Sequence, residues 1–100
     1  MTRKLDGVIE AVRYKNGQIV VVRAYERRGP TFSDHVLIDR KALLEHLQQG
    51  MHFVVGSREE LRASTFKLGQ DVLLVKQDGN EWIATRPDAG RDSLDGTPVF

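Results

Sequence analysis

Apolar residues are concentrated in two runs near the start of the chain, residues 5–14 and 18–26, on either side of Asn16-Gly17. Two such runs separated by a two-residue turn signal are typical of a β-hairpin. Asn-Gly is the preferred centre of a type I′ turn, because both of its positions need a positive φ. The pattern therefore predicts a long two-stranded ribbon.

The turn also predicts which residues face each other, and it pairs opposite charges: Glu10 with Arg23, and Asp6 with Arg27. One face of the ribbon is small and aliphatic and is expected to lie in the core: Leu5, Gly7, Ile9, Ala11, Val20, Val22 and Ala24. The other face mixes apolar residues with those charges: Val8, Val12, Tyr14, Ile19, Val21 and Tyr25. This mixed face is too apolar to lie fully in water, so another element or a partner is expected to cover part of it.

A helix is predicted over residues 40–49, with short strands before it (35–38) and after it (51–56). Asp39 is suited to cap the helix, because its carboxylate accepts from free backbone N–H groups. Apolar residues follow at helical spacing, and a glycine supplies the stop. The capping-box spacing at residues 57–60 predicts one further helical turn.

A second hairpin is predicted around Asp78-Gly79, which is again suited to a type I′ turn. Its first strand covers residues 66–77 and is expected to break at Gly69. The register that this turn fixes also pairs opposite charges: Lys76 with Glu81, and Asp71 with Arg86.

Residues 1–86 are expected to form one domain, and residues 87–100 a mostly disordered tail, because the latter are rich in Asp, Gly and Pro. The only large apolar residues that could dock this tail are Leu94, Val99 and Phe100. The order of three strands, a helix and three strands predicts a mainly β fold, a small antiparallel β-barrel. That barrel is either OB-like with an added strand or SH3-like with an inserted helix. No motif is specific enough to name a family.

The composition is that of a soluble, cytoplasmic domain: 100 residues, 40% hydrophobic, 29% charged and without cysteine. No apolar run is long enough to cross a membrane. The net charge of +1 argues neither for nor against nucleic-acid binding. The basic residues are unevenly distributed, since residues 1–28 hold seven basic and three acidic residues.

Nothing in the sequence predicts an enzyme, a metal or a cofactor. His35, His46 and His52 are not clustered at the spacing of a zinc site. Ser33-Asp34-His35 has the residue types of a hydrolase triad, but consecutive residues do not easily build its geometry. Glycine-rich phosphate loops are absent from the sequence.

Two binding functions remain, and a small-ligand pocket is neither supported nor excluded. The first is an interaction or self-association module that uses the mixed face: Val8, Val12, Tyr14, Ile19, Val21 and Tyr25. The second is an OB-like domain that binds single-stranded nucleic acid through a base-rich loop with one aromatic and through neighbouring residues of the ribbon: Arg27, Arg28 and Phe32, with Arg23 and Tyr25. Arg40 and Lys41, at the helix N-terminus, add a candidate anion site.

Overall fold

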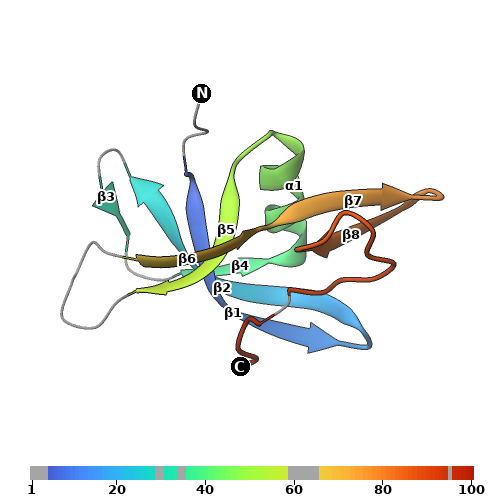
Figure 1. Cartoon of the computed structure of the whole chain (residues 1–100), viewed down its shortest axis with the longest axis horizontal. Helices are drawn as coiled ribbons and strands as arrows, with labels where there is room; N and C mark the ends of the chain where they lie inside the picture. The colour runs from blue at the N-terminus through green and yellow to red at the C-terminus, as the bar shows by residue number, and fades with distance from the viewer. Residues whose placement is uncertain (1–4, 29–30, 34–35, 59–65, 95) are drawn as a thin grey trace.

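A computed structural model of the chain describes residues 5–28, 31–33, 36–58, 66–94 and 96–100. Most of the elements in this part are strands, and one is a helix (Figure 1). In chain order they are β1 (Gly7–Lys15), β2 (Gln18–Arg28), β3 (Thr31–Phe32), β4 (Val36–Asp39), α1 (Arg40–Gln48), β5 (Phe53–Arg58), β6 (Phe66–Asp71), β7 (Leu73–Gln77) and β8 (Asn80–Ala84).

The main sheet is mixed and open. Its strands follow the order β3-β2-β1-β5-β6, and β4 pairs with a different part of β2. β1 and β5 are parallel, which is possible because α1 lies in the connection that leads into β5. β7 and β8 form a separate two-stranded sheet. The prediction of a mainly β fold is confirmed. The predicted barrel is not confirmed, because the sheet is not closed.

The first hairpin has the predicted turn and two β-bulges that were not predicted. Asn16 and Gly17 have φ values of 53° and 78°, as the turn requires. Beyond the turn, Val20 on β2 and then Glu10 on β1 have no Cα partner on the opposite strand. The first bulge shifts the pairing by one residue, and the second restores the predicted register. A bulge adds one residue to a strand and so turns the following side chains to the other face.

The bulges decide which residues enter the core. Val12 and Ile19, predicted on the mixed face, join Ile9 and Val22 in one buried cluster together with residues of α1, β4, β5 and β8. A smaller cluster contains Val8, Tyr25 and Val54, packed against Leu5 and Phe32. The mixed face is therefore largely covered by the chain itself.

The helix begins and ends almost where the sequence predicts. The Asp39 carboxylate accepts from the Ala42 N–H at 2.8 Å, and Gly50 after the C-cap has a φ of 85°. The turn predicted at residues 57–60 does not start at Ser57, which lies in β5, and Glu59 and Glu60 fall outside the described residues. No helix in the described part of the chain is long and apolar enough to cross a membrane.

β7 and β8 have the predicted register, from Gln77 beside Asn80 to Leu73 beside Ala84. The predicted pairing of Asp71 with Arg86 is wrong, because Asp71 belongs to β6 and lies beside Val54 of β5. The predicted break at Gly69 does not end the strand, because β6 continues to Asp71, but the register between β5 and β6 shifts there and leaves Gly69 and Gln70 opposite Val55. Val72 separates β6 from β7, and its N–H donates to the Phe53 carbonyl at 2.8 Å.

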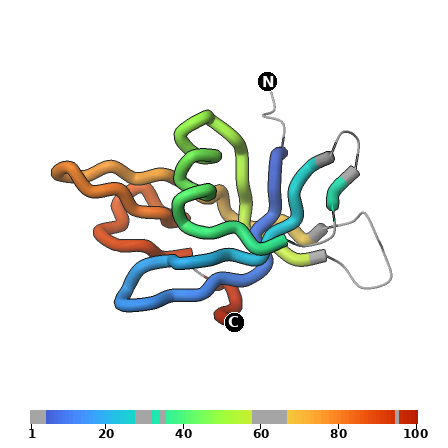
Figure 2. Tube along the Cα trace, turned by 180° about the vertical axis from the view of Figure 1, so that it is seen from behind, coloured from blue at the N-terminus to red at the C-terminus, as the bar shows by residue number. Residues whose placement is uncertain are grey.

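The described residues of the predicted disordered tail, 87–94 and 96–100, pack between the two hairpins instead (Figures 1 and 2). Ser93 forms a bridge with Ala84, and Val99 forms one with Val12. Leu94 is buried in the main core. We call residues 87–100 the C-terminal segment.

Asp92 is the junction of this arrangement. Its side chain is fully buried, and its two oxygens accept from the Ile19 N–H at 2.8 Å and the Ile83 N–H at 2.9 Å. The Arg40 guanidinium forms an ion pair with the same carboxylate. One side chain of the C-terminal segment thus joins β2, β8 and the start of α1.

Candidate functional site

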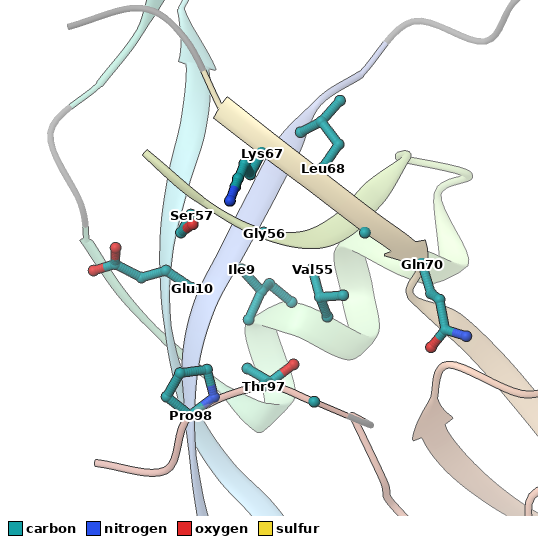
Figure 3. Close-up of a pocket in the computed structure, with 12 residues that line it drawn as sticks. Ile9, Glu10, Val55, Gly56, Ser57, Lys67, Leu68, Gln70, Thr97 and Pro98 are labelled. Atoms are coloured by element: carbon teal, nitrogen blue, oxygen red, sulfur yellow. The ribbon is translucent and has the colours of Figure 1, made fainter. Parts of the chain in front are cut away.

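A hollow of about 480 Å³ lies between the β5–β6 edge of the sheet and the C-terminal segment (Figure 3). We call it the β6 groove. Ile9 and Val55 form its floor, residues 67–70 of β6 form one wall, and residues 96–98 form the other. The groove therefore combines an apolar floor with two walls that contain exposed residues.

Two glycines allow β5 and β6 to lie close together beside the groove. A Cβ atom on Gly56 would lie 2.3 Å from the backbone oxygen of Lys67, which is not sterically possible. A Cβ atom on Gly69 would lie 3.0 Å from Val55 Cγ2 and 3.1 Å from the Val55 backbone oxygen. Glycine at these places in strands typically marks a close backbone approach, and here it shapes the groove.

The opposite wall is attached to β1 by backbone hydrogen bonds and by Phe100. The Val12 N–H donates to the Pro98 carbonyl at 2.9 Å, and the Phe100 N–H donates to the Val12 carbonyl at 3.1 Å. The guanidinium carbons of Arg13 and Arg23 lie 4.7 Å and 5.2 Å from the centre of the Phe100 ring. Cations over an aromatic ring are attracted to it, so these contacts hold the wall in place.

The polar groups of the groove differ in whether they have hydrogen-bond partners. The Glu10 carboxylate accepts from Arg23 Nε at 2.7 Å and from the Tyr25 hydroxyl at 2.9 Å. The Thr97 hydroxyl oxygen, in contrast, is buried and has no hydrogen-bond partner in the described part of the chain. Buried polar groups are normally paired, so this hydroxyl is one of the exceptions among the described residues.

The wall formed by β6 is also the end of the sheet. Within the described residues β6 pairs with β5 alone, and its residues 67–70 are all exposed. Leu68 is 55% exposed, although it is a large apolar residue in the centre of a strand. An edge strand of this kind presents unpaired N–H and C=O groups to another chain.

A second polar pair lies at the far end of β6. His52 Nε2 is 2.9 Å from Asp71 Oδ1, and His52 Nδ1 is buried without a partner in the described part. The pair borders a hollow of about 200 Å³, and none of the residues that line it is Ser, Thr, Cys or Lys. A carboxylate that orients an imidazole is half of a catalytic arrangement, but this lining supplies no nucleophile for it.

The six residues predicted to bind a partner are mostly inside the fold. Val8, Val12 and Ile19 are fully buried and Tyr25 is 6% exposed. Tyr14 is half-buried, and its hydroxyl accepts from the Leu94 N–H at 3.0 Å. Val21 is half-buried as well. The prediction of this face for a partner is therefore corrected, since the chain's own elements cover four of the six residues.

Three of the predicted nucleic-acid residues, Arg23, Arg27 and Phe32, lie near Tyr25. Arg23 and the Tyr25 hydroxyl both donate to Glu10, and Phe32 packs against the cluster that contains Tyr25. The Arg27 guanidinium carbon lies 5.2 Å from the centre of the Phe32 ring, as a base-rich loop with an aromatic suggests. The Arg27 backbone N–H donates to the Asp6 carbonyl at 2.8 Å, whereas the Asp6 carboxylate accepts from the His52 N–H at 2.7 Å. The Arg28 side chain lies outside the described residues.

The candidate anion site at the helix N-terminus is also corrected. The Arg40 guanidinium binds the buried Asp92 carboxylate and donates to the carbonyls of Ile19 and Glu81, so it is part of the core junction. Lys41 is exposed. Among the described residues, no three His, Cys, Asp or Glu side chains lie close enough to hold a metal ion. His35 and Asp34 of the triad motif lie outside the described residues.

Sequence reasoning missed the β6 groove, although one signal for it was present. Gly69 interrupts an otherwise apolar strand pattern, which is a sign either of a break or of a close approach by another backbone. We interpreted it as a break, and the structure contains the close approach. No local pattern pointed to Thr97, because its position depends on how the C-terminal segment packs.

Comparison of the chain with protein families, curated proteins and solved structures finds no match. The groove and the edge strand β6 beside it are therefore the features from which we infer a function.

Proposed function

We propose that the protein is a binding module for an extended polypeptide, which it accepts as an added strand on β6. The observation that carries this proposal is the position of an open, exposed edge strand directly beside the β6 groove. Strand addition to a sheet edge takes its affinity from main-chain hydrogen bonds, and its specificity comes from pockets for alternate side chains.

The groove is suited to receive those alternate side chains. Every second side chain of a strand added to β6 points to the same face of the sheet. Side chains of the added strand that point to one face would lie beside Leu68, which is 55% exposed, and those that point to the other face would lie beside Lys67, at the wall of the groove.

This proposal keeps the interaction function expected from the sequence and moves it to another surface. The mixed face of the first hairpin is mostly buried, whereas residues 67–70 are exposed. The nucleic-acid alternative has weaker support, because Arg40 is taken up by Asp92 and Arg23 by Glu10.

A display library of random linear peptides is the probe for this function. Peptides selected on the wild-type protein are titrated into isotope-labelled protein, and the backbone amide shifts are mapped. We expect the largest shifts at residues 67–70 and 96–98. The Ser57→Trp variant places a large ring at the groove and should weaken binding at least about tenfold through steric exclusion.

The matched control is Gln77→Trp, since Gln77 is also an exposed strand residue but lies on β7. It should bind the selected peptides like the wild type. Failure to select any peptide, or peptides that bind equally to the Ser57→Trp variant, would overturn the proposal. A single-stranded oligonucleotide that shifts Arg27 and Phe32 and loses binding as salt rises would favour the nucleic-acid function instead.

A further inference from the structure

The β6 groove holds one charge that the described part of the chain does not neutralise. Lys67 lines the groove, is exposed, and makes no ion pair with another described residue. The Glu10 carboxylate also lines the groove, but it already accepts from Arg23 and Tyr25. The remaining polar side chains of the lining are uncharged: Ser57, Gln70 and Thr97. The unpaired charge at the groove is therefore positive.

The acidic residue of β6 does not compensate for Lys67. Lys67 lies beside Ser57 and Asp71 lies beside Val54, and these two partners are three positions apart on β5. Because cross-strand partners share a face and side chains alternate along a strand, Lys67 and Asp71 point to opposite faces of the sheet. Asp71 also contacts His52 Nε2 at 2.9 Å.

The two central positions of the edge differ in the same way. Lys67 and its neighbour Ser57 lie together at the groove (Figure 3). Leu68 lies beside Gly56 and points to the other face, where it is 55% exposed. A strand added to β6 therefore meets a cation on one face and an apolar side chain on the other, at adjacent positions.

We propose that the segment which binds along β6 carries an acidic residue opposite Lys67 and an apolar residue at the adjacent position, opposite Leu68. The inference rests on the proposed function, in that β6 must accept an added strand. It goes further because it names the chemistry of that strand.

The size of the effect follows from the cross-strand contacts. A pair of opposite charges directly across two strands contributes about 1.4- to 5-fold in affinity, and like charges weaken the pairing by similar amounts. Reversal of the charge at Lys67 should therefore weaken the binding of an acidic peptide about 2- to 30-fold. Added salt should reduce this difference, because both charges are exposed.

Lysine on an edge strand can also serve only to discourage unwanted pairing. The Lys67→Gln variant separates the two roles. Recognition of an acidic residue requires that Lys67→Gln bind the selected peptides more weakly than the wild type. A lysine that only deters pairing gives equal or tighter binding when it is replaced.

Random linear peptides are selected by display on the wild type and, separately, on Lys67→Glu, and their dissociation constants are measured at low salt. The wild type should enrich Asp or Glu beside an apolar residue, and the variant should enrich Lys or Arg at the acidic position. A wild-type peptide whose acidic residue is changed to Lys should regain affinity for Lys67→Glu. The control is Lys76→Glu, the same reversal on an exposed residue of β7, which should bind like the wild type.

Peptides that map to β6 without an acidic preference overturn this inference and leave the proposed function standing. The same holds for peptides that bind the wild type and Lys67→Glu equally, or that bind Lys67→Gln as tightly as the wild type. If no selected peptide shifts the amides of residues 67–70, the proposed function fails and the inference fails with it.

Discussion

Replacing Asp92 with asparagine removes the negative charge at the junction of β2, β8 and α1 while it keeps the size of the side chain. Wild-type Asp92 accepts from two backbone N–H groups, of Ile19 and Ile83, through different oxygens. The asparagine amide has only one oxygen, so its NH₂ group must face one of these buried donors. Arg40 loses its ionic partner at the same time.

The expected cost follows from these losses. The Asp92 side chain is 0% exposed and that of Arg40 is 21% exposed, so water cannot easily replace the missing partners. Removal of one member of a buried ion pair typically costs about 3–5 kcal/mol. A domain of this kind has about 5–15 kcal/mol of unfolding free energy in all. We therefore expect the Tm to fall by at least about 12 °C, at about 4 °C per kcal/mol.

Urea unfolding followed by tryptophan fluorescence measures this loss directly, since the chain has one tryptophan, Trp82, on β8. The control is Asp88→Asn, an exposed aspartate of the same C-terminal segment, which should change stability by less than about 0.5 kcal/mol. The double variant Asp92→Asn/Arg40→Met should cost less than the sum of its single changes, because the two side chains are directly coupled.

A loss below about 1 kcal/mol for Asp92→Asn, equal to that of the Asp88 control, would refute the reasoning. Additive single changes at Asp92 and Arg40 would contradict the coupling between them.

Two further changes test the packing of the sheet and of the groove wall. Gly7→Ala should cost about 1–3 kcal/mol in urea unfolding, because its Cβ would lie 2.4 Å from the buried Phe53 ring. Gly90→Ala, where nothing lies within 4 Å, is the control, and equal stability of the two variants would contradict this account. Phe100→Ala should speed hydrogen exchange at the Val12 amide and at the amide of residue 100, because it removes the ring beside Arg13 and Arg23. Unchanged exchange would mean that these contacts do not hold the wall.

Elements with a local chemical cause were predictable from the sequence. β7 and β8 have their predicted register because Asp78 and Gly79 adopt the positive φ values of the turn and no bulge follows. The helix begins at its predicted cap because the Asp39 carboxylate needs only a neighbouring N–H group. The Arg23–Glu10 ion pair forms as predicted, although the Cα partner of Arg23 is Ala11.

Features that depend on distant parts of the chain were not predictable in this way. Glu10 and Val20 are the bulged residues, and neither is a residue type that marks a bulge. Their effect is large, because a shift of one residue moves Val12 and Ile19 from the outer face to the core. The C-terminal segment has few apolar residues, and besides Leu94 and backbone hydrogen bonds its docking uses one buried carboxylate with partners on three other elements.

The position of Asp92 in the chain also has a consequence for the order of folding. Asp92 and Ile19 are separated by 73 residues, whereas Asp92 and Ile83 are separated by only 9. Hairpins form within microseconds, but contacts between distant residues are slow to form because a long loop must close first. During refolding the turn at Asn16-Gly17 is therefore expected to form early, and the Ile19 amide should become protected only when the C-terminal segment docks. During synthesis on a ribosome, the first hairpin and the helix emerge well before the carboxylate that joins them.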